Sequence, residues 1–381
     1  MVALALDAVL PALMLIGNEF QLADNNDNQL IISTLFIGMG VGQLAYGPLS
    51  DSFGRKPALY LGLSLFVLGS ATSMLATDFN GMLIGRFLQG LGIAGPRIIC
   101  VAIVRDLYEG RMMAKVISLM MTIFIVVPIL APSLGQGILF VSHWRGIFGS
   151  YILLALVCGA WFAIRQPESL PPKLRIPFAF KPIGLGFVKV FSNWTVMGYT
   201  LIAGIISGVF LTYISTSQQV LQFQYALGTK FPLYFASIAL ATGVSSFINA
   251  KLVVRYGMQR IALFALVTLL CASLLFLLVT IQNQGHPALW SLIGYLMSCF
   301  FCLGLLFGNL NALAMQPLGD TAGTGAAIIG FTSTLISLPI ALLIGRAYDG
   351  SFTPIVVGFT LCAAVSLVMH LLTTRARSAA D

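Results

Sequence analysis

Gly47-Pro48-Leu49-Ser50-Asp51-Ser52-Phe53-Gly54-Arg55-Lys56 is a short polar break between two apolar runs, at residues 30–49 and 58–75. Glycine and proline interrupt helices, so Gly47 and Pro48 predict a tight reversal of the chain here. Asp51 is suited to cap a neighbouring helix, because carboxylates accept hydrogen bonds from helix N-terminal N–H groups. The basic residues Arg55 and Lys56 predict that the turn lies on the cytoplasmic side of a membrane.

Apolar runs of this kind recur along the whole chain. About 20 apolar residues cross a bilayer as a helix, because a helix satisfies its own backbone polar groups. The strands of a membrane barrel would instead alternate polar and apolar residues. We therefore expect an all-α membrane protein with twelve transmembrane helices, at residues 1–16, 30–49, 58–75, 81–104, 116–140, 146–164, 195–214, 233–249, 261–281, 288–312, 325–345 and 354–372.

Composition supports a membrane environment. The 381 residues are 58% hydrophobic and only 8% charged, whereas soluble domains carry about 25% charged residues. The mean hydropathy of +0.96 agrees with this deficit of charge. Too few charges remain to cover a surface that faces water, so lipid is the expected surroundings.

Basic residues set the expected orientation. With the N-terminus placed in the cytoplasm, fifteen of the 20 Lys and Arg residues lie in cytoplasmic segments and three in external loops. The other two, Arg86 and Arg97, lie within the fourth helix. This bias predicts that both termini are cytoplasmic. The bias also explains the net charge of +8, because the basic residues then face the cytoplasmic surface of the membrane. No nucleic-acid partner is therefore expected.

We expect neither a metal site nor a cofactor. The six cysteines all fall in apolar runs, where cysteine is a small packing residue, and this applies to the C-x-x-C pair Cys299 and Cys302. No nucleotide-binding loop occurs, which disfavours pumping driven by ATP.

The helices divide into two groups of six, which predicts an internal repeat. We expect an N-terminal bundle at 1–164, a cytoplasmic linker at 165–193 and a C-terminal bundle at 194–381. One trace of the repeat is a turn of the same pattern in each half, Leu49-x-x-x-Phe53-Gly54 and Leu252-x-x-x-Tyr256-Gly257. The first apolar run is short, so we expect either that a few residues precede it or that the first helix is partial.

Three motifs carry a resemblance to the major facilitator superfamily. The stretch Gly47–Lys56 resembles its signature between helices two and three, and Gly85–Gly92 resembles its helix-four signature. The stretch Pro128–Gly137 is similar to the antiporter signature of helix five, although Ala131 and Gln136 depart from it. The resemblance implies a gating turn, for which the matching residues are Gly47, Asp51, Gly54, Arg55 and Lys56. It also implies an antiporter helix, for which they are Pro128, Pro132, Gly135 and Gly137.

Finer matches point to one branch. The stretch Asp7-Ala8-Val9-Leu10-Pro11-Ala12-Leu13 resembles the first helix of the Bcr/CflA drug-resistance transporters, and Val104–Tyr108 and His143–Phe148 also look like that subfamily. The resemblance covers most of residues 1–165. It implies a drug:proton antiporter, and we expect this chain to be one in a bacterial inner membrane.

Asp7 is the one carboxylate placed deep in the bilayer. It lies nine residues before the end of its helix, hence about 14 Å from the external boundary of a core about 30 Å thick. An ionised Asp there costs about 2.5–3.5 kcal/mol, so it must face a cavity, find a partner or take up a proton. Asp7 is therefore a candidate proton carrier. The alternative is a residue at the end of a differently drawn first helix.

Arg86 is the second expected proton-coupling residue. Gln89 follows three residues later and so shares its helix face. Arginine keeps its proton and must be paired or hydrated, so we expect Arg86 to face the central cavity and to bias Asp7. The alternative is a structural arginine bonded to backbone carbonyl groups.

Polar residues inside the other helices are candidate cavity contacts. With Gln89, they are Gln43 and Tyr46 on helix two, Tyr199 and Tyr213 on helix seven, and Asn309 on helix ten. Pro128 and Pro132 lie mid-helix and predict a bend in helix five. The glycines of the helix-four signature predict close helix packing.

The expected function is proton-coupled export of small drug-like molecules by alternating access between the two bundles. The partners are then the substrate, protons and lipid, and we expect a monomer. An alternative is a proton-independent facilitator or an importer of a small metabolite with the same fold. An enzyme is disfavoured, because clustered acids or histidines at depth are missing, and a channel is disfavoured, because rings of pore-lining charge are missing.

Overall fold

The computed structural model describes residues 1–177 and 181–378. Within these ranges the chain is helical and has no strand. It divides into two compact units, Met1–Leu185 and Gly186–Asp381, called here the first and the second unit. The expected bundle boundaries at 164 and 194 remain a prediction, and residues 178–180 and 379–381 of the expected linker and second bundle lie outside the described ranges.

The first unit contains the first six apolar segments. Its first segment is broken into α1 (Val2–Asp7), the 3-10 turn η1 (Leu10–Ala12) and α2 (Leu13–Glu19). A short turn, η2 (Asn25–Gln29), leads to α3 (Leu30–Phe53), α4 (Arg55–Leu75), α5 (Phe79–Leu107), α6 (Gly110–Val141) and α7 (Arg145–Arg165).

Between the two sets of long helices come a 3-10 turn, η3 (Pro172–Leu174), and α8 (Lys181–Ser192). The other long helices are α9 (Trp194–Ser217), which continues into the π-helical η4 (Gln218–Gln224), then α10 (Phe231–Tyr256), α11 (Met258–Gln282), α12 (Leu289–Met315), α13 (Ala322–Arg346) and α14 (Thr353–Ser378).

Eleven segments among the described residues are long and apolar enough to cross a membrane, and a shorter apolar segment, Val126–Val141, lies in α6. These are the twelve predicted helices in the predicted order, and the all-α transmembrane fold is confirmed. Most helices extend a few residues beyond the expected ends. The last turns of these helices, such as residues 50–53 of α3, are polar and so do not belong to the apolar runs.

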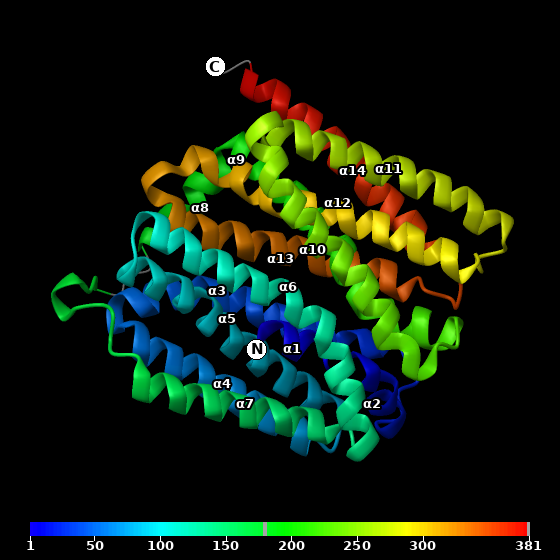
Figure 1. Cartoon of the computed structure of the whole chain (residues 1–381), viewed down its shortest axis with the longest axis horizontal. Coiled ribbons are helices and arrows are strands. Elements are labelled where there is room, and N and C mark those ends of the chain that lie inside the picture. The colour runs from blue at the N-terminus through cyan, green and yellow to red at the C-terminus, as the bar shows by residue number, and fades with distance from the viewer. Residues whose placement is uncertain (178–180, 379–381) are drawn as a thin grey trace. The chain divides into compact units, whose positions relative to one another are not determined.

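The two units repeat the same packing. In the first unit α5 packs against α3 and α4, and α4 lies beside α7; in the second, α12 packs against α10 and α11, and α11 lies beside α14 (Figure 1). In order along the chain these are the same pairs of helices. The internal repeat predicted from the two groups of six helices is therefore present in the packing.

Glycine permits the closest of these contacts, as the helix-four signature predicted. A Cβ atom on Gly90 of α5 would collide with the Leu35 carbonyl oxygen of α3, and one on Gly92 would collide with the backbone of Phe66 in α4. Small residues bring transmembrane helices together where no hydrophobic effect drives their association. The polar residues of α5 are thereby held against both neighbouring helices.

Candidate functional site

Asp7 lies at a break in the first membrane segment. It is the last residue of α1, and the 3-10 turn Leu10–Ala12 begins three residues later. Pro11 has no N–H, so it cannot make the helical bond to the carbonyl four residues earlier, which is that of Asp7. The single helix expected over 1–16 is thus two short helices, because a proline interrupts the hydrogen-bond ladder directly after the acid.

Arg86 of α5 ties this broken segment to the rest of the unit. Its side chain is fully buried. The Nη1 and Nη2 groups each donate to the Ala5 carbonyl oxygen of α1 at 3.0 Å, and Nε donates to the Ile31 carbonyl oxygen of α3 at 2.9 Å. One guanidinium therefore joins three helices through backbone oxygens. Such carbonyl contacts are those that the structural alternative for Arg86 predicts.

Gln89 extends the cluster towards α4. Nη1 of Arg86 donates to Oε1 of Gln89 at 2.8 Å, which confirms that the two side chains share one face of α5. Nε2 of Gln89 in turn donates to the Ser70 hydroxyl at 2.7 Å, and Ser70 donates to the Phe66 carbonyl oxygen at 2.7 Å. Each of these polar groups is buried and has a partner, as a low-dielectric interior requires.

The carboxylate of Asp7 takes no part in this cluster. Its residue is 4% exposed, and no hydrogen bond or ion pair joins its side chain to another residue of the described ranges. An unpaired ionised carboxylate in such a place is costly. A bias of Arg86 on Asp7 remains a prediction, while the bonds observed for Arg86 go to Ala5, Ile31 and Gln89.

The predicted antiporter helix reaches the same break. Gly135 of α6 lies so close to α1 that a Cβ atom would collide with the carbonyl oxygen of Ala8, the residue after Asp7. Pro128 and Pro132 both lie inside α6, as expected, and a Cβ on Gly137 would meet nothing. Gly135 thus contacts the segment that carries the acid.

The predicted cavity residues fall into both units. In the first unit Gln43 is half-buried, and the buried ring of Tyr46 packs against Gly95 of α5. In the second unit Tyr199 and Tyr213 of α9 are buried, and Tyr213 stacks on Phe235 at 5.6 Å between ring centroids.

Asn309 of α12, also in the second unit, donates from Nδ2 to Oδ1 of Asn249 in α10 at 2.7 Å. This bond joins two helices of one unit. A cavity shared by the residues of the two units stays a prediction.

At the α3–α4 turn, two expectations were wrong. Gly47 and Pro48 do not reverse the chain, because α3 continues through them to Phe53. The reversal occurs at Gly54, with φ 106° and ψ 160°, a backbone conformation that only glycine adopts without strain. Asp51 does not cap a helix either; its carboxylate forms an ion pair with Arg55 one turn later.

Arg55 is the centre of a charged network around this turn. Its Nε donates to the Asp106 carboxylate of α5 at 2.9 Å, and Nη1 donates to the Ser50 hydroxyl at 2.9 Å as well as to Asp51. Nη2 lies 3.4 Å from the other Asp106 oxygen, so the contact with Asp106 is bidentate. Arg55 is 8% exposed. Bidentate carboxylate contacts of this kind fix geometry as well as charge.

Glu168, which sequence reasoning missed, caps α4. Its Oε1 accepts from the Arg55 backbone N–H at 2.9 Å, and its Oε2 accepts from that of Lys56 at 3.0 Å. The residue in the capping position, Gly54, has no side chain, so a carboxylate from beyond α7 satisfies the first N–H groups of the helix. The available signal was an acid three residues after the last basic residue of α7.

The environment of Glu168 favours its charged form. Partial burial acts to raise the pKa of Glu168, but hydrogen bonds from the backbone N–H groups of Leu170, Lys56 and Arg55 and the nearby charge of Arg175 outweigh it. The pKa of Glu168 is therefore lower than that of an ordinary glutamate. The cap is charged at neutral pH and adds a charge-assisted contact at the helix N-terminus.

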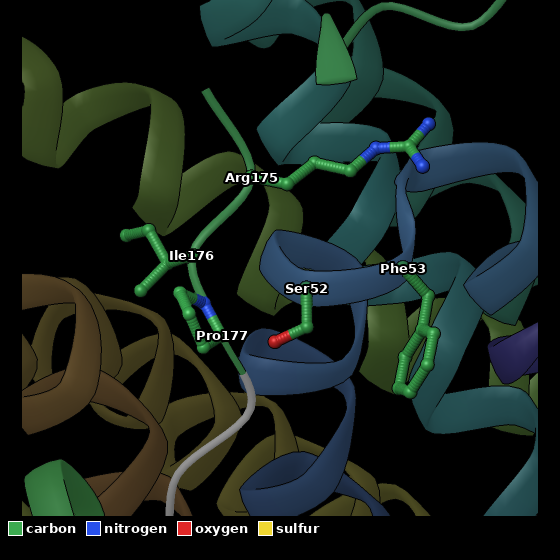
Figure 2. A pocket seen from close by; sticks show the side chains of 5 residues that line it. All are labelled: Ser52, Phe53, Arg175, Ile176 and Pro177. Atoms are coloured by element: carbon green, nitrogen blue, oxygen red, sulfur yellow. The ribbon is translucent and has the colours of Figure 1, made fainter. Parts of the chain in front are cut away.

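A pocket of about 360 Å³ borders the same turn. It is lined by Ser52 and Phe53 at the end of α3 and by Arg175, Ile176 and Pro177 from the segment after α7. Figure 2 shows Ile176 and Pro177 on an extended stretch beside Ser52. The Ile176 N–H donates to the Asp51 carbonyl oxygen at 3.1 Å, so this stretch is bonded to the turn.

The comparisons with known proteins agree with these observations. The profile described as Major Facilitator Superfamily matches residues 1–342. This chain belongs to the Major Facilitator Superfamily. The superfamily signature identified in the sequence at Gly47–Lys56 is thus the turn that Arg55 and Glu168 hold in the structure.

Two bacterial relatives within the superfamily carry drug-resistance names. The chain is 26% identical over 379 residues to the bicyclomycin resistance protein homolog of Haemophilus influenzae, with 97% of this chain and 92% of the relative covered. It is 27% identical over 365 residues to the multidrug resistance protein MdtL of Salmonella typhimurium, covering 92% and 87% of the two chains.

A solved transporter structure shares the fold. The D-xylose-proton symporter superposes with a TM-score of 0.74 at 13% identity, over 98% of this chain and 94% of that one. The chain is therefore an integral membrane transporter of the superfamily that handles small molecules, and not an enzyme. Its resemblance to the drug-resistance branch is confirmed.

Proposed function

We propose that this transporter exports small drug-like or amphipathic molecules in exchange for protons, by alternating access between two six-helix domains at 1–164 and 194–381. The names of the relatives, bicyclomycin resistance and multidrug resistance, support a drug as the substrate class. We place the protein in a bacterial inner membrane as a monomer, with both termini in the cytoplasm. The excess of basic residues in the segments then cytoplasmic supports this orientation.

The buried carboxylate of Asp7 is the observation that carries the exchange mechanism. It lies at a helix break and has no partner among the described residues, so its charge can change without the loss of an ion pair. Protonated Asp7 and bound substrate would disfavour one another. Proton entry from outside would then release the substrate outward, and proton loss to the cytoplasm would reset the site.

The membrane potential is a sufficient driving force for export of a neutral substrate against a tenfold concentration gradient. One elementary charge crossing the membrane yields about 2.3 kcal/mol per 100 mV, whereas a tenfold gradient of a neutral substrate costs about 1.4 kcal/mol. In this mechanism the cavity is lined by Gln43, Tyr46, Gln89, Tyr199, Tyr213 and Asn309. The charged turn around Arg55 gates movement of the two domains.

The test compares Asp7→Asn with the wild type in proteoliposomes loaded with a pH-sensitive dye. Bicyclomycin and a panel of cationic dyes are added, and proton movement is recorded. We expect the variant to insert normally and to lose drug-driven proton movement. Asp27→Asn, a neutralised acid in the turn between α2 and α3, is the matched control and should behave like the wild type.

Proton movement of wild-type size in the Asp7→Asn protein would exclude Asp7 as the coupling residue. Drug transport without any proton movement in the wild type would instead favour the proton-independent facilitator. Uptake of a metabolite down its own gradient, with no export of any compound of the panel, would favour the importer.

A further inference from the structure

Helix α5 carries a second arginine, Arg97, that the proposed proton exchange does not use. It follows Arg86 by eleven residues, which is about three helical turns and about 16 Å along the axis. The two side chains therefore share one face of α5. At Arg86 this face meets α1 and α3, through the carbonyl groups of Ala5 and Ile31. Arg97 thus lies on a side of α5 that is turned towards other helices of the first unit.

The two arginines differ in exposure. Arg86 is fully buried, whereas Arg97 is exposed. Ile93 and Val104 lie on the same face, four residues before and seven residues after Arg97, and they are 1% and 8% exposed. Every other residue from Gly85 to Val104 is buried or half-buried. Arg97 is therefore an exposed, charged position within a face that is otherwise covered.

Water rather than lipid is the surrounding that suits this side chain. Arginine keeps its charge, and inside a membrane-spanning helix such a charge faces the bundle interior or an aqueous path. Arg97 lies nine residues, about 14 Å, before Asp106 of the charged network at the α3–α4 turn. Side chains leave a helix towards its N-terminus, so the side chain of Arg97 starts away from that network. This direction does not favour a guanidinium that reaches back past lipid to the cytoplasmic surface.

Arg97 supplies the accessible positive charge of this part of the first unit. Between residues 58 and 104 the basic residues are Arg86 and Arg97. All three guanidinium nitrogens of Arg86 donate to groups of the protein, so Arg86 is not available to a ligand. A guanidinium presents its N–H donors as a planar fork that matches the two oxygens of a carboxylate. An anionic group is therefore the ligand chemistry that fits Arg97.

We propose that Arg97 is a substrate-binding residue, which selects exported molecules with a carboxylate or another anionic group over matched compounds without one. The proposal rests on the proposed function, because it names the substrate class of the same transporter. It is separate from proton exchange. Asp7 is an acid and cannot pair with an anion, and Arg97 lies about 16 Å along α5 from Arg86, whose partner Ala5 is close to Asp7.

The experiment compares two probes that differ in one group, by fluorescence anisotropy with the full chain in lipid nanodiscs. Rhodamine 110 has a free carboxylate, and rhodamine 123 is its methyl ester. We expect the wild type to bind rhodamine 110 about tenfold more tightly, which is the effect of one charge-assisted contact. Arg97→Gln should bind both probes alike. Arg97→Lys keeps the charge but loses the fork, so its preference should lie between the two.

The matched control is Arg105→Gln, because Arg105 is exposed in the last turn of the same helix. This variant should keep the preference of the wild type. The proposal would be overturned by a wild type that binds rhodamine 110 no more tightly than rhodamine 123, or not at all. An equal loss of preference in Arg97→Gln and Arg105→Gln would also overturn it, since any nearby basic residue would then suffice.

The outcomes for anion selection and for proton exchange can be told apart. A preference that is lost in Arg97→Gln, in a protein that moves no protons when drug is added, would support anion selection and reject the exchange. Drug-driven proton movement in a protein without a preference for the carboxylate would reject anion selection and leave the exchange in place.

Discussion

The α3–α4 turn of the first unit and the α10–α11 turn of the second each contain a glycine with a similar, positive-φ backbone conformation. They differ in the charged residues that surround the glycine. Gly54 has φ 106° and ψ 160°, and Gly257 has φ 77° and ψ 158°. Around Gly54, three carboxylates bind Arg55 and the start of α4. Arg55 forms ion pairs with Asp51 and Asp106, whereas Arg255 beside Gly257 lies 5.3 Å from the ring of Tyr256.

The distribution of acids explains this difference. Nine of the 12 Asp and Glu residues precede position 169, and the three that follow are Asp320, Asp349 and Asp381. A duplicated turn thus keeps its glycine because the backbone requires it. The contacts with three carboxylates surround Gly54, and the turn at Gly257 has a positive-φ glycine at the same position.

Replacing the arginine that follows or precedes each glycine, Arg55 or Arg255, should give the largest difference in stability between the two turns. Arg55→Ala leaves Asp106 and Asp51 without their partner, and we expect it to lower the free energy of unfolding by roughly 2–4 kcal/mol. Arg255→Ala should change it by less than about 0.5 kcal/mol, as for a surface residue. Thermal unfolding of both proteins in detergent measures the difference. Equal losses would show that the second turn has charged contacts of similar strength.

Replacing each of the two glycines by alanine should give a smaller difference in stability between the two turns. Alanine is strained at both positions, at about 1–3 kcal/mol each, because both backbones have positive φ. At Gly54 a Cβ atom would also lie 2.7 Å from Oε2 of Glu168, whereas at Gly257 it would meet nothing. Gly54→Ala should therefore be the more destabilising by about 1 kcal/mol in the same assay. The reverse order would mean that Glu168 moves aside at no cost.

Neutralising the α4 cap should have the smallest effect. Glu168→Gln weakens a charge-assisted cap, and we expect a loss of about 1 kcal/mol at pH 7. Glu109→Gln, at the α6 capping position with no side-chain bond to the helix, is the control and should be neutral.

This contribution also depends on pH. Because the folded pKa of Glu168 is lowered, the stabilisation is fully present above the ordinary glutamate pKa of about 4.3 and is lost as the pH falls through the lower folded value. The stability difference between wild type and Glu168→Gln should be constant from pH 7 to about 5 and shrink below about pH 4. A difference that vanished already at pH 6 would contradict this assignment.

The sequence alone determined the number, order and approximate ends of the membrane helices, because about 20 apolar residues in lipid have few alternatives to a helix. It also identified the superfamily through Gly47–Lys56, and Asp7 and Arg86 as buried polar residues. Only the tertiary structure decided their partners. Arg86 binds backbone oxygens of Ala5 and Ile31, and Glu168, which lies 112 residues from Lys56, caps α4. Contacts between distant segments depend on helix packing, which no local pattern of residues encodes.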